Sequence, residues 1–186
     1  ANQMGWKSKW AQEIRFVQLL KIIEEDDTFS INDLGCGNGY FLDFIKKNFP
    51  NQAFHYFGYD IMPEMIAEAN KLHPNNQDNF KVISSASDME MADYTVASGI
   101  LNLKYKASNE EWLDFIHETI STMWAKSNKG VAFNCLTSYS DKEFMRPELY
   151  YTDSLAMFDF CQKNFTRHIA LLHDYREYDF TLLLRK

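Results

Sequence analysis

The chain has 186 residues, of which 46% are hydrophobic and 24% are charged. At a prior of about 150 residues per domain, this length fits one domain over residues 1–186, and the composition excludes a disordered tail or a coiled coil. The formal net charge of −7, from 19 basic and 26 acidic residues, disfavours contact with a phosphate backbone, so no nucleic-acid partner is predicted.

The apolar runs, the cysteines and the spacing of possible ligands bear on membrane contact, cellular location and metal binding. No apolar run approaches the roughly 18 residues that span a bilayer, and none reads as a signal peptide, so no membrane partner is predicted. Cys36, Cys135 and Cys161 are odd in number and lack CxxC spacing, which favours reduced thiols and a cytoplasmic location. No histidine or carboxylate pair has metal-ligand spacing, so no metal is predicted.

The first half of the chain alternates between helical and strand patterns. Apolar residues at helical spacing predict a helix over 8–25, and a glycine cluster follows a short strand. The further elements predicted here are a strand at 30–34, a helix after Gly39 that ends before Pro50, a strand at 54–59, a helix at 63–71, and strands at 80–83 and 94–97.

The second half ends in two strands joined by a tight turn. Ahead of them the pattern predicts a helix over 109–127, a strand at 130–135, a polar loop at 137–147 and a helix from Asp153 to Phe165. The strands at 167–172 and 178–185 then form a β-hairpin. The order predicts an α/β protein with a mostly parallel sheet of seven strands and a C-terminal antiparallel hairpin.

The segment Asp33-Leu34-Gly35-Cys36-Gly37-Asn38-Gly39 lies at a predicted strand-to-helix junction. Ligands of such sheets bind at the carboxyl ends of the strands, and glycines let a ligand approach the backbone closely. A dinucleotide site prefers G-x-G-x-x-G/A, but the sixth position from Gly35 is the bulky Tyr40. The carboxylate of Asp33 instead suits a cofactor with a cationic end, such as S-adenosylmethionine.

A second acidic residue, Asp60, ends the next predicted strand 21 residues after Gly39. A carboxylate at this position can accept hydrogen bonds from both ribose hydroxyls of a nucleoside. The alternative interpretation of Asp60 is an N-cap for the helix that Pro63 opens, and the two roles are compatible.

These segments together resemble the class I S-adenosylmethionine-dependent methyltransferases. Residues 33–39 match the first motif of that family, 59–66 look like its second motif, and 93–102 are similar to its fourth-strand segment. The terminal hairpin matches the family's antiparallel seventh strand. The resemblance implies a Rossmann-like, doubly wound sheet with helices on both faces, and S-adenosylmethionine as the cofactor.

The resemblance also implies roles for single residues. The backbone at 35–37 would pass the methionine part, which Asp33 organises; Asp60 would hold the ribose. Many relatives have an acidic residue after the third strand that contacts the adenine amine, whereas this chain offers Ser84 or Ser85, or Asp88 from further along. The implied cofactor-binding set is Asp33, Gly35, Cys36, Gly37, Gly39, Asp60, Ile61, Met62, Ser84, Ser98 and Gly99.

The residues on the acceptor side are expected in loops at the strand ends and in the N-terminal segment 1–27, which is expected to be helical and to cap the active site. Orientation alone can supply about 7–11 kcal/mol of a barrier, so no catalytic signature is required. Arg15 has the alternative of a surface salt bridge, and the adjacent tyrosines that of simple packing. The main candidates are Arg15, Asn102, Tyr150 and Tyr151; the others are Trp6, Gln12, Tyr105, Asn134, Thr137 and Tyr139.

The predicted function is methyl transfer to a small-molecule acceptor by a monomer or homodimer. The Asn/Asp-Pro-Pro-Tyr signature of enzymes that methylate base amino groups is absent, as is a Pro-Cys pair for base C5 methylation. Two alternatives stay open: a non-catalytic cofactor-binding or interaction module with the same fold, and an NAD(P)-dependent oxidoreductase, which Tyr40 opposes.

Overall fold

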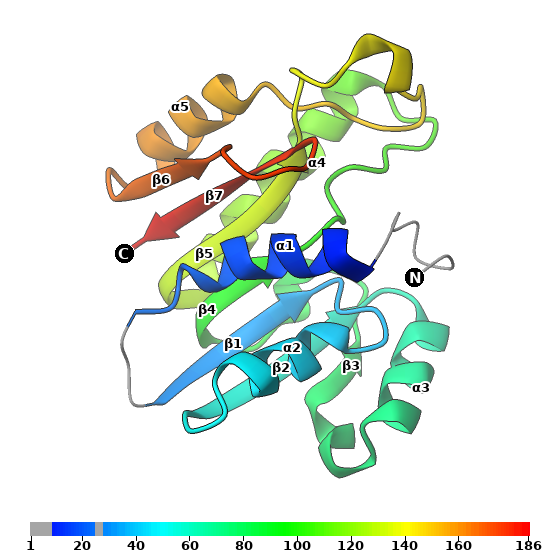
Figure 1. Ribbon diagram of the computed structural model, residues 1–186, viewed down its shortest axis with the longest axis vertical. Helices are drawn as coiled ribbons and strands as arrows, with labels where there is room; N and C mark the ends of the chain where they lie inside the picture. Colours follow the sequence, from blue (N-terminus) through cyan, green and yellow to red (C-terminus); the bar gives the residue numbers. More distant parts are fainter. Residues whose placement is uncertain (1–8, 25–27) are drawn as a thin grey trace.

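The computed structural model describes residues 9–24 and 28–186, and its centre is a seven-stranded sheet (Figure 1). The strand order is β3-β2-β1-β4-β5-β7-β6. β1 to β5 run parallel, whereas β7 runs antiparallel to both β5 and β6. The strands are β1 Thr28–Leu34, β2 Ala53–Asp60, β3 Phe80–Val82, β4 Ala92–Ala97, β5 Ser127–Leu136, β6 Ile169–Leu172 and β7 Asp179–Arg185.

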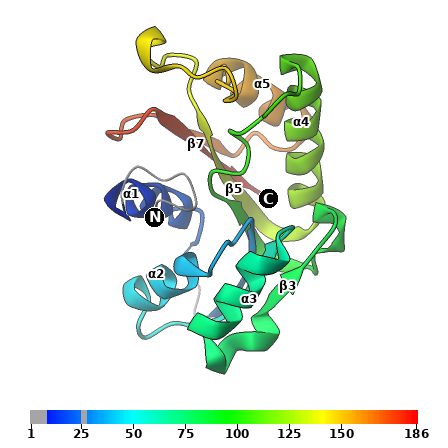
Figure 2. The same ribbon diagram turned by 90° about the vertical axis from the view of Figure 1, so that its right-hand side faces the viewer.

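Helices cover both faces of this sheet (Figure 2). On one face, apolar side chains of α1 (Lys9–Leu20), α2 (Tyr40–Asn48) and α3 (Pro63–Leu72) share a buried cluster with the strands. On the other face, α4 (Asn109–Ala125) and α5 (Ser154–Asn164) bury a second cluster. The predicted fold class is therefore confirmed, including the antiparallel hairpin of β6 and β7.

The sheet reverses its order at β1, which pairs with β2 on one side and with β4 on the other. β2 and β3 are added outward on one side of β1, whereas β4 and β5 are added on the other side, followed by β7 and then β6 at the edge. In such sheets the loops that follow the two central strands diverge and leave a crevice at the carboxyl edge. The glycine segment follows β1 and the segment 98–102 follows β4, so both lie at this edge.

Local signals explain most helix boundaries. α4 begins with a capping box in which Ser108 Oγ accepts from the N–H of Glu111 and the Glu111 carboxylate accepts from the N–H of Ser108. Asp153 caps α5 by accepting from two backbone N–H groups, and Pro63 occupies the first turn of α3. Short 3₁₀ helices occur at η2 Pro74–Asn79, η3 Ala86–Asp88 and η4 Lys142–Phe144.

Two helices are shorter than the sequence pattern predicts. α1 ends at Leu20 instead of residue 25, because the chain tightens there into turns in which Lys21, Ile22 and Ile23 donate to carbonyls three residues back. α4 ends at Ala125 because β5 begins at Ser127 to pair with β4. The buried face of α1 also differs, since Trp10 is exposed while Arg15 is buried.

Candidate functional site

Three glycines after β1 adopt backbone angles that other residues rarely adopt. Gly35, Gly37 and Gly39 have φ values of 78°, 55° and 82°. A Cβ atom on Gly35 would lie 2.1 Å from Cγ2 of Ile100, and one on Gly39 would collide with Phe80. The loop therefore requires glycine at all three positions for its turn, and at Gly35 and Gly39 also for its close packing.

Asp60 connects the end of β2 to this glycine loop. Its Oδ2 accepts a hydrogen bond from the N–H of Gly37 at 3.0 Å, and its Oδ1 accepts from the N–H of Met62 at 2.9 Å. The two motifs found in the sequence thus meet in space. The N-cap interpretation of Asp60 is wrong, because Met62 occupies the cap position of α3.

Asp33 lies beneath the loop and is almost completely buried. The hydroxyl of Tyr56 donates a hydrogen bond to Asp33 Oδ2 at 2.6 Å. Burial raises the pKa of Asp33 to about 7, the Tyr56 hydrogen bond opposes this shift, and the negative charge of Asp60 adds to it. Burial also raises the pKa of the neighbouring Cys36 thiol, so that thiol is neutral and unreactive.

The raised pKa of Asp33 predicts how the stability of the ligand-free protein depends on pH. A carboxyl whose pKa is higher in the folded than in the unfolded state binds more protons when folded. The free energy of unfolding should therefore fall as the pH rises from about 4 to 7. Asp33→Asn keeps an acceptor for Tyr56 and should flatten this dependence, as urea titrations at several pH values would measure. An equally steep fall in the variant would contradict the assignment to Asp33.

The residues predicted to contact an adenine differ in their exposure and in their hydrogen bonding. Ile61 and Met62 are apolar yet 71% and 50% exposed, an unusual state for two adjacent apolar side chains. Asp88 accepts from the N–H groups of Ser84 and Ser85 at 3.1 and 3.0 Å. Its Oδ2 is therefore occupied by its own loop, while Ser84 is exposed next to the end of β3.

The segment after β4 is tied to β5 by one amide. Asn134 Oδ1 accepts from the N–H of Gly99 at 3.0 Å, and Asn134 Nδ2 donates to Ser98 Oγ at 3.3 Å. Gly99 has φ 80° and follows directly on the carboxyl end of the strand. Asn134, predicted as an acceptor-side residue, is fully buried and holds this segment in place.

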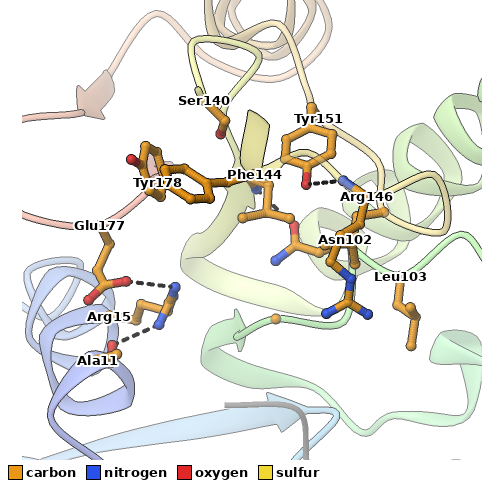
Figure 3. A pocket seen from close by; sticks show the side chains of 13 residues that line it. Ala11, Arg15, Asn102, Leu103, Ser140, Phe144, Arg146, Tyr151, Glu177 and Tyr178 are labelled. Atoms are coloured by element: carbon orange, nitrogen blue, oxygen red, sulfur yellow. Dashed lines mark hydrogen bonds and ion pairs between the residues drawn. The ribbon is translucent and has the colours of Figure 1, made fainter. Parts of the chain in front are cut away.

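A cavity of about 330 Å³ opens beside Gly99 (Figure 3). Its walls come from α1, the segment after β4, the loop between β5 and α5, and the segment before β7. The lining is mixed, with aromatic rings and leucines beside two arginines, one glutamate and one asparagine. The residues are Ala11, Arg15, Gly99, Asn102, Leu103, Leu136, Ser140, Phe144, Arg146, Leu149, Tyr151, Glu177 and Tyr178.

Three of the four main acceptor-side candidates, Arg15, Asn102 and Tyr151, line this cavity. Tyr150 does not; its side chain packs against the core under α4 and its backbone N–H donates to the carbonyl of Asn102 at 2.8 Å. Trp6 lies outside the described residues. Sequence reasoning missed Glu177, Phe144 and Arg146, for which no motif gave a signal.

Arg15 ties α1 to the first residue of β7. Its Nε donates to Asp179 Oδ2 at 2.8 Å, its Nη1 donates to the carbonyl of Ala11 at 2.9 Å, and its Nη2 pairs with both Asp179 and Glu177. Asp179 is fully buried. The salt-bridge interpretation of Arg15 is confirmed, but the pair is buried instead of lying on the surface.

Two further findings concern residues 9–24 and 28–186. Within these ranges no group of three or more His, Cys, Asp or Glu side chains is arranged to hold a metal ion. No helix in the same ranges combines the length and apolar character needed to cross a membrane.

Tyr40 occupies the third glycine position of a dinucleotide fingerprint. Its ring packs on that of Phe16 in α1, with the ring centroids 5.8 Å apart, and its hydroxyl donates to Glu13.

Comparisons with known proteins agree with this geometry. Residues 32–121 match the family described as "Methyltransferase domain". The chain is 44% identical over 168 residues to "Putative methyltransferase Rv1506c" of Mycobacterium tuberculosis, covering 90% of this chain and 99% of the relative.

Methyltransferases whose solved structures have a similar fold are named for different acceptors. Magnesium protoporphyrin IX methyltransferase of Synechocystis, with bound S-adenosylhomocysteine (SAH), has a TM-score of 0.64 at 14% identity, covering 100% of this chain and 92% of that one. The small RNA methyltransferase HEN1 has a TM-score of 0.68 at 16% identity, covering 94% of this chain and 25% of that one. At these identities the likeness concerns the fold alone.

Proposed function

The chain belongs to the methyltransferase family, and from this premise we propose that it uses S-adenosylmethionine and that its acceptor is a small molecule bound in the cavity beside Gly99. The observation that carries the proposal is the place of that cavity at the carboxyl end of β4. Its volume of about 330 Å³ falls at the lower end of small-ligand pockets, which span about 300–1,000 Å³.

The residues around the glycine loop fit the cofactor chemically. Asp33 and Asp60 offer carboxylates for a cationic amino-acid end and for ribose hydroxyls, and the exposed side chains of Ile61 and Met62 offer an apolar surface for a base. When bound, S-adenosylmethionine supplies a methyl group already activated by its sulfonium. The residues proposed to hold it are Asp33, Gly35, Cys36, Gly37, Gly39, Asp60, Ile61, Met62, Ser84, Ser98 and Gly99.

The chain's own contribution to the reaction is then orientation and the exclusion of water. Gly99 lies on the wall of the cavity and in the proposed cofactor set, so both reactants would meet there. Asn134 holds Gly99 by its backbone N–H, and the Arg15–Asp179 pair holds α1 across the cavity. Rigid walls of this kind favour an in-line approach of acceptor and donor.

Filling the cavity tests this proposal. Ala11 lines it from α1 and is 4% exposed, so Ala11→Phe should abolish methyl transfer to a small acceptor while leaving SAH affinity within twofold. The acceptor is first sought by following SAH formation with a library of small metabolites, and with RNA and protein for comparison. Val17→Phe, on the exposed side of the same helix, is the matched control and should keep activity. Transfer only to RNA or protein, or full activity in Ala11→Phe, would refute the proposal.

A further inference from the structure

We propose that the acceptor is a ring-bearing molecule whose polar group is an oxygen with free lone pairs, a hydroxyl or a carboxylate, and that Asn102 recognises this oxygen. The inference rests on the proposed function, because it names the chemical class that fits the same cavity. It excludes a protonated amine, an ammonium group, at Asn102.

The orientation of the Asn102 amide is set by its surroundings. The side chain is 8% exposed, and its Oδ1 accepts a hydrogen bond from the N–H of Leu136 at 2.9 Å. Turning the amide over would place two donors, Nδ2 and the Leu136 N–H, against each other. The Asn102 backbone is held as well, since its carbonyl accepts from the N–H of Tyr150.

The Nδ2 group of Asn102 consequently faces the cavity (Figure 3). Among the described residues, none accepts a hydrogen bond from Nδ2. In the free protein, water can accept from this donor in the open cavity; a ligand that displaces the water keeps the hydrogen bond only when it supplies lone pairs itself. A protonated amine has none to offer, so it would leave this donor unsatisfied.

The other polar groups of the cavity also present mainly donors. Arg146 is exposed at the cavity wall, where its guanidinium pairs with Glu148. Its backbone N–H donates to the hydroxyl oxygen of Tyr151 at 2.9 Å, which leaves the Tyr151 hydrogen for another acceptor. Glu177 is the one carboxylate among the described lining residues, and Arg15 pairs with it. Near Asn102 the cavity is therefore suited to an oxygen and not to a cation.

The remaining walls favour a ring. Phe144 and Tyr178 form an aromatic pair with ring centroids 6.4 Å apart, and Leu103, Leu136 and Leu149 add apolar surface. An apolar cavity of about 150 Å³ is large enough to hold benzene. A cavity of about 330 Å³ thus has room for a molecule with one or two rings.

Three ligands that share one ring system and differ in polar group test the inference. Titration calorimetry on the full chain saturated with SAH, at neutral pH, compares 2-naphthol, 2-naphthoate and 2-naphthylmethylammonium. We expect 2-naphthol or 2-naphthoate to bind at least tenfold more tightly than the ammonium ligand, and the ratio of those two separates a hydroxyl from a carboxylate acceptor.

The variant Asn102→Asp replaces the donor that faces the cavity with an acceptor and keeps the shape of the side chain. The variant keeps an oxygen for the Leu136 N–H but replaces Nδ2 with a second carboxylate oxygen, so the order of affinities should invert. Asn128→Asp, at an exposed position of β5, has the same charge change and should keep the wild-type order. If Asn102→Asp does not fold, the wild-type order alone decides.

The outcomes separate this inference from the proposed function. Preference of the wild-type protein for the ammonium ligand overturns the inference, as does an unchanged order in folded Asn102→Asp. Binding of SAH without binding of any of the three ligands also overturns it and leaves the cofactor assignment intact. Failure of SAH itself to bind would refute the proposed function together with the inference.

Discussion

Replacing Asp60 with Ala should weaken S-adenosylmethionine binding by about a hundredfold. A hydrogen bond to a charged group contributes about 1.5–3 kcal/mol, and each 1.4 kcal/mol changes affinity about tenfold. In the proposed role the carboxylate holds the ribose, and it also ties the glycine loop to β2 through the N–H of Gly37. The variant loses both contributions at once.

Titration calorimetry with S-adenosylmethionine and SAH measures this loss. Asp60→Asn keeps the shape and one acceptor oxygen and should lose less affinity than Asp60→Ala. Asp78→Ala, at an exposed position in η2, has the same charge change and should bind normally. A loss below threefold in folded Asp60→Ala would show that the ribose is held elsewhere.

Arg15→Met should lower the free energy of unfolding by about 3–5 kcal/mol, the usual cost of removing one partner of a buried ion pair. Asp179 is fully buried, and its Oδ1 has no hydrogen-bond partner among the described residues. Burial already raises the pKa of Asp179, and Arg15 opposes this shift. Without Arg15 the pKa rises further, so the variant should lose stability most at high pH, where the carboxyl must ionise.

A double variant separates the contribution of the Arg15–Asp179 ion pair to stability from that of side-chain packing. Arg15→Met/Asp179→Leu removes both charges and should recover much of the lost stability, because the fully buried carboxylate is gone and only the partly exposed Glu177 loses its partner. Urea denaturation measures Arg15→Met, the double variant and a control, Lys21→Met. Lys21→Met, at an exposed position just after the same helix, should change stability by less than about 0.5 kcal/mol. A cost below about 1 kcal/mol for Arg15→Met would mean that Asp179 is stabilised without its partner.

The succession of helices and strands along the chain and the glycine loop could be predicted because their signals are local. Alternation of apolar residues and the spacing of glycines act within a few positions, and they set the backbone at Gly35 and Gly39 directly. The approach of Asp60 to Gly37 could also be expected, because adjacent parallel strands end at one edge of a sheet. The ends of α1 and α4 could not, since tight turns and strand pairing override helical spacing there.

By itself, then, the sequence determined the fold class, and it predicted the cofactor and the loop proposed to bind it, all of which depend on short segments. Only the tertiary structure decided the cavity that we propose for the acceptor. Arg15 meets Asp179 across 164 residues, and Asn102 turns its Nδ2 inward because Leu136 of a neighbouring strand occupies its Oδ1. Contacts between distant segments depend on how the helices and the terminal hairpin pack on the sheet, and no local pattern records that packing.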